Sequence, residues 1–174
     1  MEVRHLILAQ QAREGNGSAF GELYTLYYRE LYAYARFVLG AAQPAQDAVQ
    51  EAALAAFAQV GNLRDAAAFK HWLFRILANI CRRQLSARAA EEPAVSLDET
   101  EITLSSHEID LTLALELRQA LSALQEDERE IVLLGVLGGY SSREIASALR
   151  CPANTVRSKR KRALEKLRNA LDLD

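Results

Sequence analysis

Five of the six residues from Arg157 to Arg162 carry a positive charge, which is the densest chemical signal in the sequence. Ammonium and guanidinium groups bind nucleic-acid phosphates, and an arginine can also donate two hydrogen bonds to a guanine edge. The wider segment from Arg143 to Arg168 has nine basic residues and two acidic ones, a net charge of +7. The segment predicts a nucleic-acid contact; an ordinary helical hairpin with a basic, solvated face is the alternative.

A second basic patch runs from Arg64 to Arg88, with six basic residues, one acidic residue and a net charge of +5. Between the two patches lies an acidic stretch from Glu91 to Asp110, with seven acids and no base. The net charge of the whole chain is only −2. This distribution favours two contacts with one polyanion over a uniformly basic surface, although two solvated helix faces would also produce it.

The sequence lacks the usual patterns of catalysis and metal binding. His5, His71 and His107 are far apart, and there is no glycine-rich phosphate loop and no nucleophile elbow. Cys81 and Cys151 stand alone, without a CxxC pair or nearby histidines. We therefore expect reduced structural thiols, no metal, no cofactor and no enzymatic activity.

Helix-forming residues dominate the 174-residue chain, which is 50% apolar and has only 3 prolines and 8 glycines. An all-α protein is expected. Apolar residues at helical spacing predict four helices in the first half: a short one ending at 15–17, one from about 20 to 40, one from about 44 to 61, and one following a loop at 62–65. Residues 1–87 should form a small four-helix bundle.

Helical periodicity is lost between residues 88 and 110, which are acidic and contain Pro93, so this segment is the expected flexible linker. Residues 111–174 are expected to form a second small helical domain. In it, Ser141 and Glu144 have the spacing of a capping box, and a turn at 150–153 separates that helix from a basic one. This layout predicts a helix-turn-helix, whose second helix enters the major groove of DNA.

Helix starts and cellular location can also be predicted. Ser18, Asp127 and Asn154 are residue types that favour N-caps, so we expect helices to begin at these positions.

No apolar run approaches the roughly 20 residues that span a bilayer, and the N-terminus lacks the pattern of a secretion signal. We expect a cytoplasmic protein without a membrane span.

Four short runs together resemble a known family: DAVQE at 47–51, WLFRILAN at 72–79, EIA at 144–146 and TVRS at 155–158. Their order and separation are similar to those of the extracytoplasmic-function sigma factors of bacterial RNA polymerase, which consist of sigma domains 2 and 4. The resemblance implies a factor that binds core RNA polymerase and directs promoter-specific initiation by recognising the minus-10 and minus-35 elements.

The resemblance implies polymerase contacts with the clamp coiled coil of the largest subunit and with the flap. Asp47, Gln50 and Glu51 match the clamp-binding positions, and their spacing places them on one polar helix face; polar residues that merely keep the helix soluble are the alternative. Trp72 continues an apolar stripe and is expected in the core. The groups available to hold the separated minus-10 strand are Arg64, Lys70, His71, Asn79, Arg82 and Arg83.

In the last helix, the positions that match minus-35 contacts in the family are Thr155, Arg157, Ser158, Lys161 and Arg162. Two neighbours depart from the family pattern: Lys159 stands where arginine is common, and Arg160 where an apolar residue is usual. Because Arg160 follows Val156 by four residues, it falls on the inward face. Either its side chain extends back to solvent or the helix is rotated.

Other functions compete with the sigma-factor interpretation. A free-standing transcriptional regulator would also use the helix-turn-helix, but would leave the runs at 47–51 and 72–83 without a purpose. A structural helical adaptor would not need the +7 segment, and an enzyme would need a site that the sequence lacks. An anti-sigma factor is a further partner that the family suggests.

Overall fold

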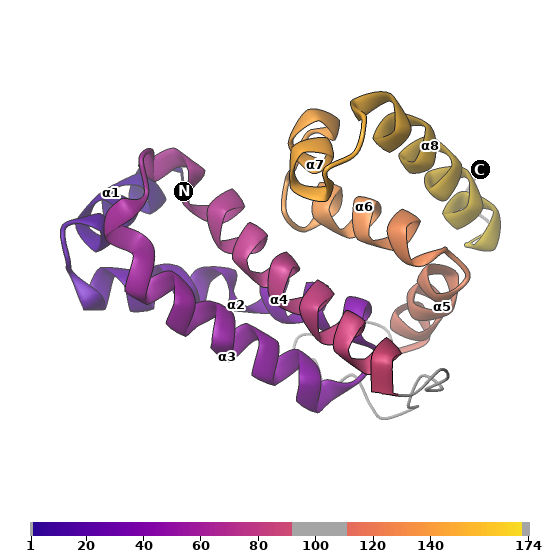
Figure 1. Cartoon of the computed structure of the whole chain (residues 1–174), viewed down its shortest axis with the longest axis horizontal. Coiled ribbons are helices and arrows are strands. Elements are labelled where there is room, and N and C mark those ends of the chain that lie inside the picture. The colour runs from indigo at the N-terminus through magenta and orange to yellow at the C-terminus, as the bar shows by residue number, and fades with distance from the viewer. Residues whose placement is uncertain (1, 92–110, 172–174) are drawn as a thin grey trace. The chain divides into compact units, whose positions relative to one another are not determined.

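The computed structural model describes residues 2–91 and 111–171 (Figure 1). All regular secondary structure in these two ranges is helical, which confirms the all-α prediction. The chain divides into two compact units, Met1–Asp98 and Glu99–Asp174. Each unit is described by itself.

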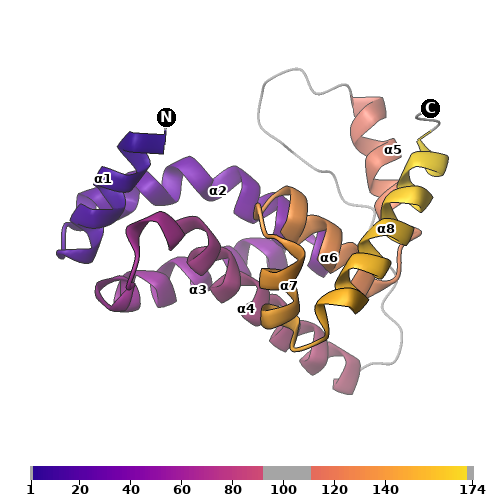
Figure 2. The ribbon, with the colours of Figure 1, turned by 90° about the horizontal axis from the view of Figure 1, so that it is seen from above.

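The first unit contains four long helices, as the apolar periodicity predicted. Two short 3-10 turns, Val60–Asn62 and Ala66–Ala68, replace the loop expected before the fourth helix. The helices pack as neighbours, α2 against α1, α3 and α4, and α3 against α4 (Figure 2). Their bounds are α1 Glu2–Arg13, α2 Gly17–Leu39, α3 Ala42–Gln59 and α4 Phe69–Glu91.

The core of the first unit forms where α2 and α4 meet. Tyr34 and Phe74 are both fully buried, with ring centroids 5.9 Å apart in an edge-to-face contact. Such aromatic pairs remove large apolar surfaces from water and also favour one relative orientation of their helices. Leu23 and Leu31 of α2 and Leu73 of α4 are also fully buried. This core fixes which face of α4 points outward.

Several local expectations in the first unit are corrected. Asn16, not Ser18, caps α2, because its side-chain oxygen accepts a hydrogen bond from the backbone N–H of Ala19 at 3.1 Å. The apolar spacing of α3 predicts that Phe57 is buried in the core, yet 55% of it is exposed. Trp72 is half-buried instead of being enclosed in the core. Its ring centroid lies 5.9 Å from that of Phe69.

Helix α4 continues to Glu91, past residue 88 where the linker was expected to begin. Arg88 links the last turn of α4 to α2, because its guanidinium donates a 3.3 Å hydrogen bond to the carbonyl of Leu39 at the C-terminal end of α2. A cation near the C-terminal end of a helix also interacts favourably with the negative end of the helix dipole. The rest of the expected linker, residues 92–110, lies outside the described residues.

The second unit contains the predicted helix-turn-helix. Ser141 and Glu144 form the expected capping box: the Ser141 N–H donates to the Glu144 carboxylate at 2.8 Å, and the Glu144 N–H donates to the Ser141 hydroxyl at 3.3 Å. Arg150 ends the first helix in the left-handed conformation, with φ of 52°. The helices are α5 Leu111–Ser122, α6 Glu126–Val136, α7 Ser142–Leu149 and α8 Ala153–Ala170.

Two predicted N-caps in the second unit are wrong. Helix α6 begins after Gln125, and Asp127 lies inside its first turn. Helix α8 begins after Pro152, so Asn154 is its second residue. In both cases a neighbouring residue with extended backbone starts the helix, which leaves the predicted cap side chain to contact other groups. The apolar spacing of α8 predicts that Leu164 points inward, yet it is 45% exposed.

Within the described part of the chain, no helix is both long and apolar enough to cross a lipid bilayer.

Candidate nucleic-acid interface

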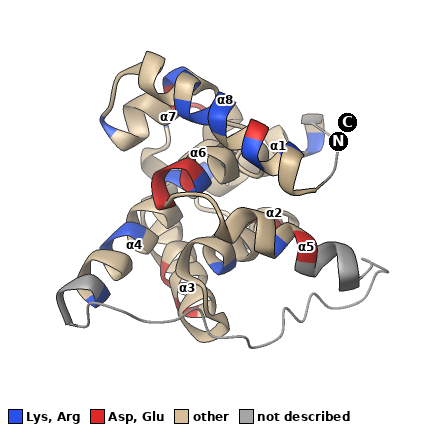
Figure 3. Ribbon diagram, turned by 90° about the vertical axis from the view of Figure 1, so that its right-hand side faces the viewer, with Lys and Arg blue, Asp and Glu red and all other residues tan. Residues whose placement is uncertain are grey.

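The first three turns of α8 bring the predicted minus-35 residues together. Arg157, Ser158, Lys161 and Arg162 are exposed, and Thr155 is half-buried. The Arg157 guanidinium donates to the Asn154 side-chain oxygen at 2.6 Å, which holds it near the start of the helix. These residues therefore offer a surface of cations and hydroxyl groups immediately after the tight turn. Figure 3 shows lysine and arginine on α8 and acidic residues at the start of α6.

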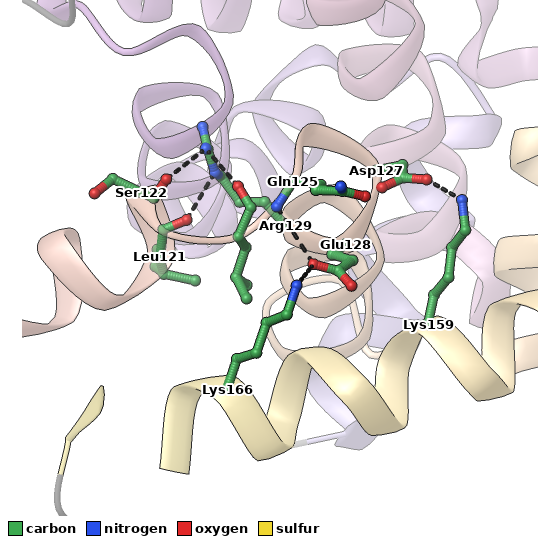
Figure 4. A network of polar contacts seen from close by, with 9 residues as sticks. Leu121, Ser122, Gln125, Asp127, Glu128, Arg129, Lys159 and Lys166 are labelled. Atoms are coloured by element: carbon green, nitrogen blue, oxygen red, sulfur yellow. Dashed lines mark hydrogen bonds and ion pairs between the residues drawn. The ribbon is translucent and has the colours of Figure 1, made fainter. Parts of the chain in front are cut away.

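Two lysines of α8 point toward α6. Lys159 pairs with Asp127, and Lys166 pairs with Glu128 at 2.7 Å (Figure 4). The Glu128 side chain is only 4% exposed, and its carboxylate also accepts a 3.3 Å hydrogen bond from the backbone N–H of Gln125. The hydrogen bond from Lys166 is the main cause that lowers the pKa of Glu128, as that from Lys159 lowers the pKa of Asp127. Both carboxyl groups therefore remain ionised at neutral pH.

Arg160 is accommodated by a glycine on α6. Its guanidinium lies against Gly135, where an added Cβ atom would come within 3.2 Å of the Arg160 Cζ atom. The side chain is half-buried and lies across the α6 backbone. This contact resolves the departure from the family pattern: the inward arginine fits because the facing position has no side chain.

Arg129 fixes the turn that joins α5 to α6. Its guanidinium donates to the carbonyl of Leu121 at 2.9 Å, that of Ser122 at 3.4 Å and that of Leu124 at 3.1 Å (Figure 4). Carbonyl groups at a helix C-terminus lack partners within the helix, so one planar cation satisfies several of them. No pattern in the sequence predicts this role.

In the first unit, one stripe of α4 presents polar and basic groups outward. His71, Arg75 and Asn79 follow one another at intervals of four residues, and Arg82 comes three residues later, so they share a helix face. Arg75 and Asn79 are exposed, and the Arg82 guanidinium donates to the Asn79 side-chain oxygen at 3.0 Å. Arg75 was absent from the predicted set although its spacing places it at the centre of the stripe.

The other three predicted minus-10 residues lie elsewhere. Lys70 points to α2, where its ammonium is 2.6 Å from Glu30 and 5.6 Å from the centroid of the Tyr27 ring. Arg83 points to α3, where it pairs with Glu51. Arg64 is exposed between the two 3-10 turns. The six residues predicted as one site are thus divided between an outward stripe, its two flanks and a loop.

Helix α3 has the polar face expected of it. Asp47 and Gln50 are exposed and Glu51 is half-buried, while the alanines and the valine between them are packed inward. Two large apolar residues, Leu54 and Phe57, extend this face, with exposed fractions of 73% and 55%. Exposed apolar residues beside charged ones are typical of protein-binding surfaces. Sequence reasoning missed Leu54 and placed Phe57 in the core.

Comparison with known proteins identifies the family. Residues 23–91 match the family described as Sigma-70 region 2, and residues 114–167 match that described as Sigma-70, region 4. The RNA polymerase sigma-H factor of Pseudomonas aeruginosa is 31% identical, over 94% of this chain and 92% of its own length. The chain belongs to the extracytoplasmic-function (ECF) sigma factor family. The ECF RNA polymerase sigma-E factor of Escherichia coli is 32% identical over the same shares of both chains.

Solved structures of sigma factors agree with this assignment. CnrH, solved in complex with the cytosolic domain of CnrY, is similar with a TM-score of 0.69 and 30% identity, over 98% of this chain and 99% of that chain. RpoE, solved with the anti-sigma factor NepR from Bartonella quintana, has a TM-score of 0.72 and 26% identity, over 89% and 98%. Sigma factors are non-catalytic initiation factors that direct RNA polymerase to promoters, so the predicted family and function are confirmed.

Among the residues that the structure describes in this sigma factor, no group of three or more histidine, cysteine, aspartate or glutamate side chains is placed to hold a metal ion. Cys81 is buried and Cys151 is half-buried, and neither forms a disulfide.

Replacing Lys166 with methionine should destabilise the second unit by about 1–3 kcal/mol at neutral pH, because buried Glu128 loses its charged partner. Since this pair lowers the folded-state pKa of Glu128, its stabilisation is complete above the unfolded-state pKa of about 4.3 and is lost as the pH falls through the lower folded-state pKa. Hydrogen exchange of α6 and α8 amides in the full chain should show a large difference between variant and parent at pH 7, and a smaller one at pH 3.

The control is Arg168→Met, which removes an exposed charge from the same helix and should leave exchange unchanged. A pH-independent difference between Lys166→Met and the parent would contradict the role assigned to the ion pair.

Proposed function

We propose that the two units of this sigma factor divide promoter recognition, with residues 1–87 binding core polymerase and the minus-10 strand, and residues 111–174 reading the minus-35 duplex. Residues 88–110 would connect them. The observation that carries the proposal is the sorting of cations on α8. Lys159 and Lys166 are paired with α6, whereas Arg157, Lys161 and Arg162 lie on the exposed side.

The minus-35 contact follows from this sorting. The exposed groups lie near the N-terminal end of α8, the part of a recognition helix that meets base edges in the major groove. Arg157 and Arg162 can donate two hydrogen bonds each to guanine, while Ser158 and Lys161 suit contacts with the phosphate backbone. Thr155 is half-buried beside the turn and can reach a phosphate or a thymine methyl group.

The minus-10 contact is assigned to the outward stripe of α4. His71, Arg75, Asn79 and Arg82 combine cations with groups that hydrogen-bond to unpaired bases. Arg64 in the preceding loop would extend this surface. Lys70 is assigned a packing role instead, because its ammonium is enclosed between Glu30 of α2 and the neighbouring aromatic rings.

The polymerase anchor is assigned to the exposed face of α3. Leu54 and Phe57 supply an apolar centre, and Asp47, Gln50 and Glu51 supply a polar and acidic edge. An apolar centre with a charged edge resembles the anatomy of protein interfaces, in which a few central side chains contribute most of the affinity. The acidic edge suits a basic partner, and in the family this partner is the clamp coiled coil of the largest polymerase subunit. The flap is the partner proposed for the second unit.

Location and regulation follow from the same role. A protein that works with polymerase on promoters acts in the cytoplasm, and we place this sigma factor there. The RpoE structure contains an anti-sigma factor and the CnrH structure the cytosolic domain of CnrY. We propose that this chain is also held by an anti-sigma factor.

Run-off transcription with purified core polymerase on a library of genomic fragments tests the proposed function. The full chain should direct initiation at a defined set of promoters when core polymerase is present, and should bind the same promoters weakly alone. Weak binding is expected because each unit supplies only part of the contact. Tight, sequence-specific footprints from the chain without polymerase would instead indicate a free-standing regulator.

Replacing Arg157 with alanine should weaken minus-35 recognition by about 1–3 kcal/mol if the guanidinium pairs with a base. The readout is the initiation rate from promoters with single substitutions across the minus-35 element, since loss of a base contact relaxes specificity at one position. Lys161→Ala is the comparison variant and should lower initiation evenly across all sequences. Unchanged sequence preference in the Arg157 variant would move base recognition to other residues.

Replacing Leu54 with aspartate should reduce capture of core polymerase by at least about 30-fold, as expected for a central interface residue worth about 2 kcal/mol. The fold should tolerate the change because this side chain is 73% exposed. Val3→Asp is a matched control on α1, where the side chain is 70% exposed. Equal polymerase capture by the two variants would exclude the α3 face as the anchor.

A further inference from the structure

One ion pair joins the two surfaces that the first unit presents to different partners. Arg83 lies at the edge of the polar stripe of α4, and its guanidinium pairs with Glu51 of α3. Glu51 in turn lies on the anchor face, one helical turn from Asp47 and less than one from Leu54. The Arg83 and Glu51 side chains are 64% and 46% exposed, so a binding partner can reach either of them.

We propose that the Glu51–Arg83 ion pair couples polymerase docking to capture of the separated promoter strand. While Arg83 is paired with Glu51, its charge is neutralised and it attracts phosphates weakly. When a basic surface of the polymerase binds the Glu51 carboxylate, Arg83 loses its partner and can bind a DNA phosphate. This inference rests on the proposed function, because it requires both surfaces.

Thermodynamic linkage makes the coupling reciprocal. If polymerase bound at Glu51 raises the affinity of Arg83 for DNA, then DNA bound at Arg83 raises the affinity of Glu51 for polymerase by the same factor. Exposed ion pairs contribute little free energy, so the factor is about 1.5- to 5-fold. The pair therefore biases strand binding toward the polymerase-bound state and does not switch it fully on or off.

The other flank of α4 has a different character. Lys70 pairs with Glu30 at 2.6 Å, but Glu30 belongs to α2 and not to the anchor helix. The Lys70 ammonium also lies 5.6 Å from the centroid of the Tyr27 ring and 5.8 Å from that of Phe74. A polymerase bound at the α3 face would not compete for this lysine, so the coupling is confined to the Arg83 side.

The first test measures binding of a fluorescein-labelled single-stranded oligonucleotide, dT15, to the full chain without polymerase. Glu51→Gln should bind dT15 about 1.5- to 5-fold more tightly than the parent. The slope of log affinity against log salt should steepen by about 0.7, as expected for one additional phosphate contact with a single strand. In the Arg83→Gln background, Glu51→Gln should change neither quantity.

The matched control is Glu22→Gln. It removes the same charge from the same unit and breaks a similar exposed pair, in which Arg4 is 3.1 Å from Glu22 and the two side chains are 71% and 49% exposed. The control should leave dT15 affinity nearly unchanged, since this pair joins α1 to α2 away from the α4 stripe.

The second test measures capture of core polymerase in the absence of DNA. Arg83→Gln releases the Glu51 carboxylate, so this variant should bind polymerase more tightly than the parent. The expected factor equals the gain in dT15 affinity that Glu51→Gln produces. Arg4→Gln is the matched control and should have no such effect. If Arg83→Gln binds core polymerase no more tightly than Arg4→Gln does, the coupling is overturned.

Equal effects of Glu51→Gln and Glu22→Gln on dT15, no gain from Glu51→Gln, or a gain that persists without Arg83 would each overturn the inference as well. Failure of the proposed function would appear differently, as a parent chain that neither captures core polymerase nor directs run-off transcription. The dT15 measurements use no polymerase, so the two failures are distinguishable.

Discussion

A helix that binds DNA through its cations must also be held to its own domain, and in this protein the acidic first turn of α6 meets that requirement. Asp127 and Glu128 take the two lysines of α8 that point inward. Without these carboxylates, the charges of Lys159 and Lys166 would add to the repulsion among the cations already present on α8. Their neutralisation allows the remaining cations to gather on the outward side, while the buried stripe of Val156, Ala163 and Leu167 orients α8.

Basic residues of α4 are also neutralised by acidic residues of neighbouring helices, in this case on two sides. Lys70 is neutralised by Glu30 of α2, and Arg83 by Glu51 of α3. The residues between these flanks, Arg75 and Asn79 among them, are left on the exposed stripe. In both units, acidic residues of neighbouring helices thus decide which basic residues hold the fold and which are available to a ligand.

Periodicity in the sequence was sufficient to locate the helices and the helix-turn-helix, because an apolar stripe at helical spacing is a property of one segment. The N-caps were harder to predict, since Asn16, Gln125 and Pro152 each compete with a neighbour of favourable type. The binding surfaces were predicted only in part. The minus-35 set lies together because it belongs to one helix end, whereas the minus-10 set was divided by contacts with other helices.

The missed residues differ in their cause. Leu54 follows Gln50 by four residues and Glu51 by three, so helical spacing alone could have placed it on the exposed face. The exposure of Phe57, which contacts Phe20, depends on how α2 packs against α3. The role of Arg129 likewise depends on carbonyl groups that become available only when α5 ends at Ser122. Such features arise from the packing of several segments, so they required the structure.

The contact between Arg160 and Gly135 couples these two positions. A Cβ atom at 135 would lie 3.2 Å from the Arg160 Cζ atom, so the flexible guanidinium would have to shift by a few tenths of an ångström. An apolar residue at 160 would leave the surface above Gly135 uncovered unless that position gained bulk. An engineer who grafts this helix onto another scaffold would keep the arginine in its present position most simply by transferring the glycine with it.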